Sequence, residues 1–191
     1  PSRERIGVPT PFTCEMLASI PECVPEDVAD AARRARAAQP AWAATSLAER
    51  RAIFLRFHDL LLDRREQALD LIQLESGKAR IQALEEVLDT CLVARHYAIH
   101  AARYLRPRKR WGALPLVTTT WERRKPLGVV GCIAPFNFPL ILGLTDLIPA
   151  LMAGNGAVLR PDVQSSLTAL WAVDLLYRAG LPEDLLRVVT G

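Results

Sequence analysis

Residues 125–161 constrain the fold more than any other part of the chain, because they alternate in the pattern of a strand, a loop, a helix and a second strand. Residues 127–134 are a β-rich apolar run without polar alternation, which is typical of a central parallel strand buried on both faces. Residues 140–153 are long enough for a crossover helix, and the Gly-Asn-Gly at 154–156 tolerates the positive φ of a helix C-cap. Since residues 157–160 resume as a strand, the stretch predicts one βαβ unit.

The loop between the first strand and the helix has the sequence Pro-Phe-Asn-Phe-Pro. Its last residue, Pro139, suits the first turn of a helix, where a missing N–H costs nothing. Ligands of open α/β sheets bind beyond the carboxyl ends of the strands. Asn137 and Arg160 each follow such an end, so we predict that they are neighbours in a ligand crevice.

Three motifs carry a resemblance to a known family: IAPFNFP at 133–139, LIPALMAGNGAVLRP at 147–161 and AGLPEDLLRVVTG at 179–191. In order and spacing they resemble the aldehyde dehydrogenase superfamily, nearest to its succinate-semialdehyde dehydrogenase branch. The resemblance runs from about Thr13 to Gly191 and covers well under half of a family member of usual length. It implies an NAD(P)-dependent enzyme that oxidises a small-molecule aldehyde, such as succinate semialdehyde, to a carboxylic acid.

The predicted fold class is α/β, with N-terminal helices followed by the first half of a Rossmann-like parallel sheet. We divide the chain into a helical part of the cofactor domain at 1–110, an oligomerisation-type strand segment at 111–124, and the first half of an NAD(P)-binding domain at 125–191. The resemblance implies that the middle segment takes part in oligomerisation and that the full-length protein forms a homo-oligomer. A sheet with so few strands would expose a hydrophobic edge, which predicts a fragment or a product that needs a partner.

Four helices are predicted before the sheet. The first opens at Pro25, with acidic residues in its first turn, and runs toward Pro40. Ser46 and Glu49 form a capping box for the second, whose polar face includes Arg50. The third helix is predicted over 66–74, ended by Gly77, and the fourth, long and amphipathic, over 78–104. The later predicted elements are a strand with one polar side over 116–123, a helix capped by Ser165 or Ser166 and closed by Gly180, a short helix from Pro182, and a strand over 186–189.

Charge and composition argue against a nucleic-acid or membrane protein. The 24 basic and 21 acidic residues leave a formal charge of only +3, and the basic segments 106–110 and 123–125 lack the interleaved aromatic residues of a stacking platform. Residues 138–159 are apolar over a length that could cross a bilayer as one helix. Asp146 and Pro149 interrupt that run, so a buried crossover helix followed by a strand is the preferred interpretation.

The cysteines show no disulfide or metal-binding spacing. Cys14, Cys23, Cys91 and Cys132 form no CxxC pair, and no signal-like segment precedes them. Reduced thiols and a cytoplasmic location are therefore expected. The resemblance implies that the family's nucleophilic Cys and general-base Glu lie beyond Gly191, so the chain alone should be inactive. A rival interpretation is a non-catalytic truncated product or interaction module that keeps half of the fold.

Asn137 is the candidate catalytic residue. On spacing alone it is an ordinary loop residue, since Asn tolerates a turn between strand and helix. The resemblance changes that interpretation, because it implies that the Asn137 side-chain amide donates a hydrogen bond to the oxyanion formed when a thiolate attacks the aldehyde. Phe136 stands where the family commonly has Trp, which keeps an apolar wall and removes an indole donor.

The resemblance also implies a cofactor site. Arg160 falls where the family usually has a Lys that contacts the adenosine ribose, and its planar guanidinium suits a phosphate better; an ordinary surface cation is the alternative. Val163 replaces a Glu that many NAD-dependent members use to bind the ribose 2′-hydroxyl, whereas Asp162 supplies a carboxylate one place earlier. We therefore predict NADP or NAD as the cofactor, with NADP favoured. The cofactor-binding candidates are Ala134, Pro135, Phe136, Asn137, Arg160, Pro161, Asp162 and Val163.

Two further patterns carry no site. His96 and His100 have the i, i+4 spacing of metal ligands, but no third ligand is apparent nearby, so two partly exposed histidines are preferred to zinc. No metal site is predicted. The chain also lacks GxxxxGK(S/T) and GxGxxG, so Gly154 and Gly156 are assigned to a helix stop rather than to a phosphate-binding loop.

Overall fold

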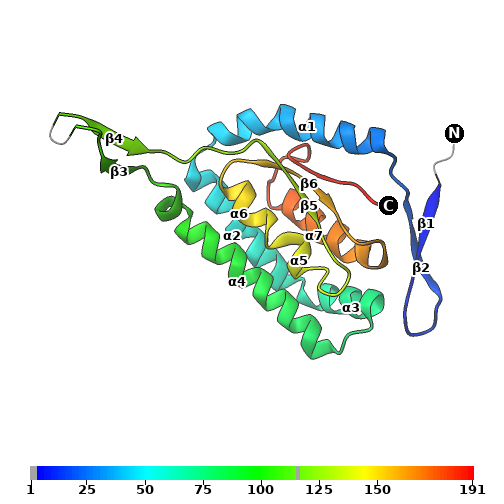
Figure 1. The fold of residues 1–191 in the computed structure, drawn as a ribbon. Coiled ribbons are helices and arrows are strands. Elements are labelled where there is room, and N and C mark those ends of the chain that lie inside the picture. The colour runs from blue at the N-terminus through cyan, green and yellow to red at the C-terminus, as the bar shows by residue number, and fades with distance from the viewer. Residues whose placement is uncertain (1–3, 115–116) are drawn as a thin grey trace.

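The computed structural model describes residues 4–114 and 117–191, and within them one parallel sheet lies at the centre (Figure 1). Its strands are β5 (Val129–Ile133), β6 (Gly156–Arg160) and β7 (Leu186–Val188), in the order β5-β6-β7. Both pairings are parallel. The predicted βαβ unit and the final strand are thus confirmed.

Strand β5 is not the central strand that the sequence predicted. Within the described residues it pairs only with β6, so it lies at an edge of the sheet, and its last residue, Ile133, is 78% exposed. The strand is also shorter than the predicted 127–134. At its start the backbone N–H groups of Leu127 and Gly128 both donate to Asn155 Oδ1, at 2.6 and 3.0 Å, although Gly128 O still accepts from Gly156 N at 2.8 Å.

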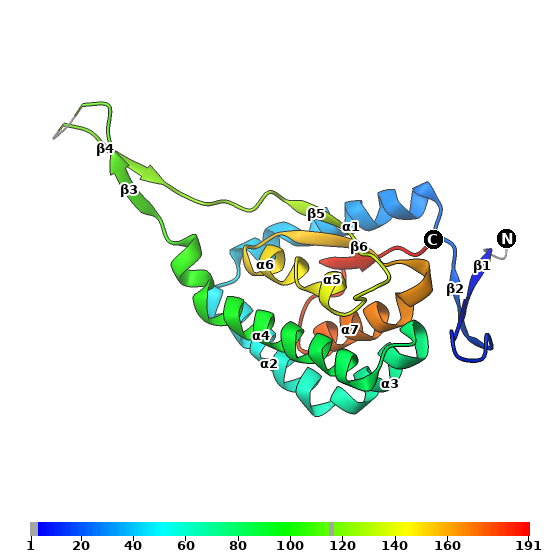
Figure 2. The ribbon, with the colours of Figure 1, turned by 60° about the horizontal axis from the view of Figure 1, so that its bottom comes forward.

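Helices cover both faces of the sheet. They are, in chain order, α1 (Pro25–Ala44), α2 (Leu47–Asp63), α3 (Arg65–Ser76), α4 (Arg80–Leu105), α5 (Ile141–Leu144), α6 (Leu147–Met152), the 3-10 turn η1 (Val163–Ser165) and α7 (Ser166–Arg178). Figure 2 shows α1 on one side of the sheet and α2, α4 and α7 on the other. The sheet is therefore the middle of three layers.

The central strand β6 serves both layers, because successive side chains of a strand point to opposite faces. Val158 packs with Ala31 and Ala35 of α1. Ala157 and Leu159 belong instead to the large apolar cluster formed with the helices on the other face. Complete burial of a side chain such as Leu159 is worth roughly 1.5–3 kcal/mol. The uninterrupted apolar run of this strand thus follows from its position between two helical layers.

Helix α1 runs through Pro40 to Ala44 instead of ending near the proline. Proline removes one hydrogen bond of the helix and crowds the preceding turn. Side-chain contacts on both sides of it hold the last turn in place. Gln39 Nε2 donates to Gly154 O at 2.8 Å, and Trp42 Nε1 donates to Leu151 O at 2.8 Å.

Arg50 lies in the core rather than on the polar face of α2. It is only 7% exposed, and its guanidinium donates to Met152 O and to Thr45 O, each at 3.1 Å. The group also stands 5.9 Å from the centroid of the Trp42 ring. Helix periodicity placed Arg50 outside, but the end of α6 presents carbonyl groups with partial negative charge, which a guanidinium satisfies. The buried arginine is therefore a cap for another helix.

The crossover between β5 and β6 is two short helices instead of the single helix predicted over 140–153. The break falls at Thr145 and Asp146, between α5 and α6. Pro149 explains it, because proline has no N–H to donate to the carbonyl of Thr145 and its ring crowds that group. Gly154, at φ 93°, ends the second piece in the left-handed conformation, as predicted.

Several local predictions are confirmed by the backbone. The capping box of α2 is present, with Glu49 N 3.1 Å from Ser46 Oγ and Ser46 N 2.7 Å from Glu49 Oε2. Gly77 ends α3 at φ 71°, and α4 spans nearly the whole predicted range. The short helix predicted from Pro182 is wrong: this segment is a single turn closed by Leu185 N donating to Pro182 O at 3.0 Å.

Two antiparallel hairpins lie outside the three layers (Figure 1). The first, β1 (Arg5–Pro9) with β2 (Met16–Pro21), was not predicted from the sequence. The second pairs β3 (Arg108–Trp111) with β4 (Thr119–Glu122) and projects from the body of the chain. It contains the strand predicted over 116–123, of which residue 116 lies outside the described residues.

The projecting hairpin is exposed on both sides. Every residue of β3 is exposed, and so are the first three residues of β4. Trp111 and Trp121 share one face of the hairpin and are 91% and 54% exposed. The apolar side of the predicted strand therefore has no cover among the described residues. In the described part of the chain, no helix is both long enough and apolar enough to span a membrane.

We expect Trp42→Phe to destabilise the chain by about 0.5–1.5 kcal/mol, because it removes the buried hydrogen bond from the indole to Leu151 O, which keeps the bond from Gly154 N at 2.9 Å. Chemical denaturation followed by circular dichroism measures this as a lower midpoint. Trp111→Phe is the matched control, since that indole is 91% exposed and should leave the midpoint unchanged. Equal midpoints for the two variants would contradict the role assigned to Trp42.

Candidate functional site

The carboxyl ends of the three parallel strands meet at one edge of the sheet. Ala134 N donates to Arg160 O at 2.9 Å, and Val189 N donates to Leu159 O at 2.9 Å. These bonds continue the pairing with β6 just beyond the ends of β5 and β7. The two segments that hold all the predicted site residues, 134–137 and 160–163, therefore start side by side.

Asn137 lies in the loop that follows this junction. Ala134 is 3% exposed and anchors the start of the loop, whereas Phe136 is 54% exposed and Asn137 is also exposed. The loop ends in buried residues, Pro139 and Leu140. The structure thus presents the amide of Asn137 at the sheet edge between two fixed points of the backbone.

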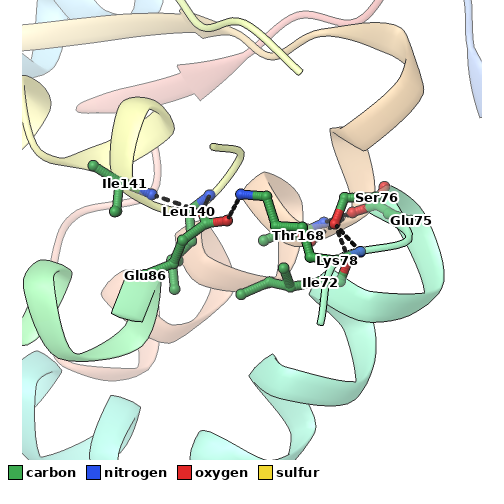
Figure 3. Close-up of polar contacts among 8 residues, drawn as sticks. All are labelled: Ile72, Glu75, Ser76, Lys78, Glu86, Leu140, Ile141 and Thr168. Carbon is green, nitrogen blue, oxygen red and sulfur yellow. Dashed lines mark hydrogen bonds and ion pairs between the residues drawn. The ribbon is translucent and has the colours of Figure 1, made fainter. Parts of the chain in front are cut away.

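A buried carboxylate holds the far end of this loop. Glu86, on α4, accepts hydrogen bonds through Oε2 from Leu140 N at 3.0 Å and Ile141 N at 3.4 Å (Figure 3). It also forms an ion pair with Lys78. The sequence analysis did not single out either residue. The available signal was a carboxylate in the buried stripe of α4, since an unpaired charge is almost never fully buried.

Arg160 lies beside a groove between α1 and the sheet. The groove has a volume of about 530 Å³, and its apolar lining includes Val28, Ile133 and Val158. Arg160 is half-buried, and its Nε donates to Gly191 O at 2.8 Å. The guanidinium is therefore held by the backbone at the end of β7 instead of extending freely from the surface.

The segment after Arg160 turns at once into η1. Pro161 is buried, and Asp162 Oδ1 accepts a hydrogen bond from Gln164 N at 2.9 Å. One carboxylate oxygen of Asp162 thus caps its own turn. Val163 is the first residue of that turn and is half-buried.

The thiols of Cys91 and Cys132 lack the features of a reactive nucleophile. Burial, together with the charge of Asp59, raises the pKa of Cys91 to about 12. Burial is also the main cause of the raised pKa of Cys132, with a smaller contribution from Asp146. A thiol with a raised pKa is protonated at neutral pH and reacts slowly. Cys132 stands on β5 beside the groove, but its environment does not favour the thiolate.

The histidine pair lies on α4 with stacked rings, and His96 is exposed whereas His100 is half-buried. The rings of His96 and His100 have centroids 4.5 Å apart, and His96 Nε2 is 2.9 Å from the hydroxyl of Tyr104. Over residues 4–114 and 117–191, no group of three or more His, Cys, Asp or Glu side chains is arranged to hold a metal ion.

Comparisons with curated proteins find semialdehyde dehydrogenases. A putative NADP-dependent succinate-semialdehyde dehydrogenase of Mycolicibacterium smegmatis is 48% identical over 180 residues, which are 94% of this chain and 35% of that protein. An N-succinylglutamate 5-semialdehyde dehydrogenase of Caulobacter vibrioides is 37% identical over 191 residues, 100% of this chain and 40% of that protein. The chain thus spans between a third and a half of the length of these relatives.

A solved structure has the same fold over nearly the whole chain. It is the NADP-dependent glyceraldehyde-3-phosphate dehydrogenase of Bacillus halodurans, crystallised with NADP, which matches with a TM-score of 0.93 and 36% identity. The match covers 98% of this chain and 40% of that one. The predicted α/β fold class is therefore confirmed, as a part of a larger fold.

The family model that matches is described as the aldehyde dehydrogenase family, and it matches residues 1–191. The fold match at a TM-score of 0.93 agrees with that family. On this evidence the chain belongs to the aldehyde dehydrogenase family.

Proposed function

We propose that this chain is the N-terminal part of an NAD(P)-dependent aldehyde dehydrogenase that oxidises a semialdehyde to a carboxylic acid. The observation that carries the proposal is the shared sheet edge, where the Asn137 loop and the Arg160 segment start side by side. Relatives named for succinate semialdehyde and for N-succinylglutamate 5-semialdehyde support this substrate class. Succinate semialdehyde is the specific candidate.

Asn137 would stabilise the transition state. Its exposed amide, held between the buried Ala134 and Leu140, is available to donate to the negative charge that develops on an aldehyde oxygen under nucleophilic attack. One amide donor of this kind is worth about 2.7–4 kcal/mol. The attacking thiolate and the base would come from the part of the enzyme beyond residue 191.

The residues at the strand ends fit a dinucleotide. The apolar groove beside the sheet suits a flat, mostly apolar group, and Arg160 supplies positive charge next to it. A bound NAD(P) would supply the acceptor for the hydride that leaves the aldehyde carbon. Ala134, Pro135 and Phe136 would shape one wall, while Arg160, Pro161, Asp162 and Val163 would form the other.

NADP is the favoured cofactor. The hydrogen bond to Gly191 O uses one donor of the Arg160 guanidinium fork, whose other N–H groups could pair with a phosphate. Asp162 is engaged with the backbone of its own turn, and Val163 carries no charge that would repel a phosphate. Relatives named as NADP-dependent support the same choice.

Assembly and location complete the proposal. The projecting β3–β4 hairpin exposes the indoles of Trp111 and Trp121, which suits contact with another subunit, so we assign the enzyme to a homo-oligomer. The cytoplasm fits the four free cysteines, because thiols stay reduced there.

A second candidate is a non-catalytic product that keeps this half of the fold. The raised pKa values of Cys91 and Cys132 favour it for the chain taken alone, because neither is a ready nucleophile. We expect the pure 191-residue chain to produce no NADH or NADPH above buffer with any semialdehyde. The absorbance of the reduced cofactor measures this. Turnover by the chain alone would show that its own residues complete an active site.

In the full-length enzyme, Asn137→Ala should lower kcat about a hundredfold or more and leave cofactor affinity unchanged, as expected for a donor that acts only in the transition state. Steady-state kinetics and cofactor titration measure the two effects. Gln164→Ala is the matched control, since it removes another exposed amide at the same sheet edge. A loss confined to cofactor binding would contradict the oxyanion role.

Arg160→Ala should weaken the binding of NADP about tenfold more than that of NAD, because a charge-assisted hydrogen bond to the 2′-phosphate is worth about 1.5–3 kcal/mol. Fluorescence titration of both cofactors gives the two dissociation constants. Arg36→Ala is the control, since that arginine lines the same groove from α1. Equal losses of affinity for NADP and NAD, or a wild-type enzyme that does not bind NADP, would rule out recognition of the 2′-phosphate by Arg160.

A further inference from the structure

Two carboxylates, on α3 and α4, are buried on the side of the sheet opposite α1 (Figure 3). Glu86 is 0% exposed and Glu75 is 5% exposed. Neither has a part in the function proposed above. A charge in such a place is costly unless it is paired and hydrogen-bonded. Their partners therefore indicate what each carboxylate does.

Glu75 caps a helix that is remote from the Asn137 loop in sequence. Its oxygens accept from Leu167 N at 2.6 Å, from Thr168 N at 2.7 Å and from Thr168 Oγ1 at 2.5 Å. These are donors of the first turn of α7, which a helix leaves without internal partners. Glu75 thus joins α3 to α7 and stabilises the packing.

Glu86 does the same for the first turn of α5, but that turn directly follows the Asn137 loop. The carboxylate accepts from Leu140 N and Ile141 N, at 3.0 and 3.4 Å. These amides belong to the third and fourth residues after Asn137. The position of the loop's far end is therefore determined by a side chain of α4.

Lys78 connects this carboxylate to the loop itself. Its ammonium forms an ion pair with Glu86, and the same nitrogen stands 3.8 Å from the centroid of the Phe138 ring. The Lys78 side chain is only 14% exposed, and its backbone N–H donates to Ser76 Oγ at 3.4 Å. A cation over an aromatic face is attracted to it. One ion pair thus holds the residue next to Asn137 as well as the amides beyond it.

We propose that Lys78 and Glu86 are positioning residues that hold the Asn137 amide in its catalytic orientation. The proposal rests on the oxyanion role of Asn137 stated above. A transition-state donor must be held within roughly 0.5 Å of the productive geometry by the groups around it. The ion pair meets this need because it reaches the loop at Phe138 and at Leu140. Neither side chain is assigned any contact with the substrate.

The test uses the full-length enzyme and separates positioning from simple stability. Replacing both charges together, in Glu86→Gln/Lys78→Met, leaves no unpaired buried charge and nearly keeps the size of both side chains, whereas removing one partner alone would leave the other charge buried and unpaired. We expect this double variant to melt near the wild type and to bind cofactor equally well. Its kcat should fall about tenfold to a hundredfold, the loss that a small displacement of a catalytic group produces. A stable double variant with wild-type kcat would overturn the proposal.

Glu75→Gln is the matched control. It removes a buried, helix-capping carboxylate of the same kind, but one whose bonds go to Leu167 and Thr168. It should lower the melting temperature and leave kcat unchanged. If Glu75→Gln slowed turnover as much as Glu86→Gln, loss of packing would explain both results and positioning by Glu86 would be excluded.

A double-mutant cycle connects the pair to Asn137. In the Asn137→Ala background there is no amide to position, so adding Glu86→Gln should cause no further fall in kcat. If Asn137→Ala and Glu86→Gln instead lowered kcat by independent factors that multiply in the double variant, Glu86 would act by another route. If Asn137→Ala itself left turnover unchanged, the oxyanion role would fail; if it slowed turnover and the ion-pair variants did not, only the positioning role would fail.

Discussion

The structure depends on satisfying the backbone groups of a broken crossover. Pro149 divides the connection between β5 and β6 into two short helices, and the first amides of α5 and the last carbonyls of α6 need partners from outside a regular helix. Side chains from distant segments supply the partners. Glu86 accepts from the start of α5, whereas Trp42 and Arg50 donate to carbonyls at the end of α6. The helices before the sheet are thus bonded to the crossover as well as packed against it.

This arrangement explains why the site lies on a well-supported edge. The loop with Asn137 begins at a backbone bond to β6 and ends at two amides bound by Glu86. Arg160 is held by Gly191 O, so the guanidinium is oriented by the end of β7. Loops usually move more than the elements they join, and a catalytic donor on a loop needs such fixed points. Under the role proposed for Asn137, the polar contacts behind the sheet bear on function as well as on stability.

Local sequence patterns predicted those elements that depend on residues only a few positions apart. The capping box at Ser46 and Glu49 depends on groups three residues apart, and Gly77 ends α3 because glycine tolerates a positive φ. The βαβ unit was predictable from the length of its apolar runs. The edge position of β5 was not, because apolar composition is the same for a strand at an edge as for one at the centre. The candidate residues could be placed at strand ends, but their surroundings could not.

The sequence by itself thus determined the order of helices and strands around the sheet, the family, and the two loops that follow β5 and β6. It did so because periodicity, caps and motifs act over a few residues. Only the tertiary structure decided that Arg50 is buried, that α1 continues past Pro40, and that Lys78 and Glu86 lie behind the Asn137 loop. Each of these outcomes depends on a partner at least 50 residues away, such as Leu140 for Glu86, which lies 54 positions further along the chain. A buried charge is stabilised only by groups that folding brings to it, and no local pattern contains them.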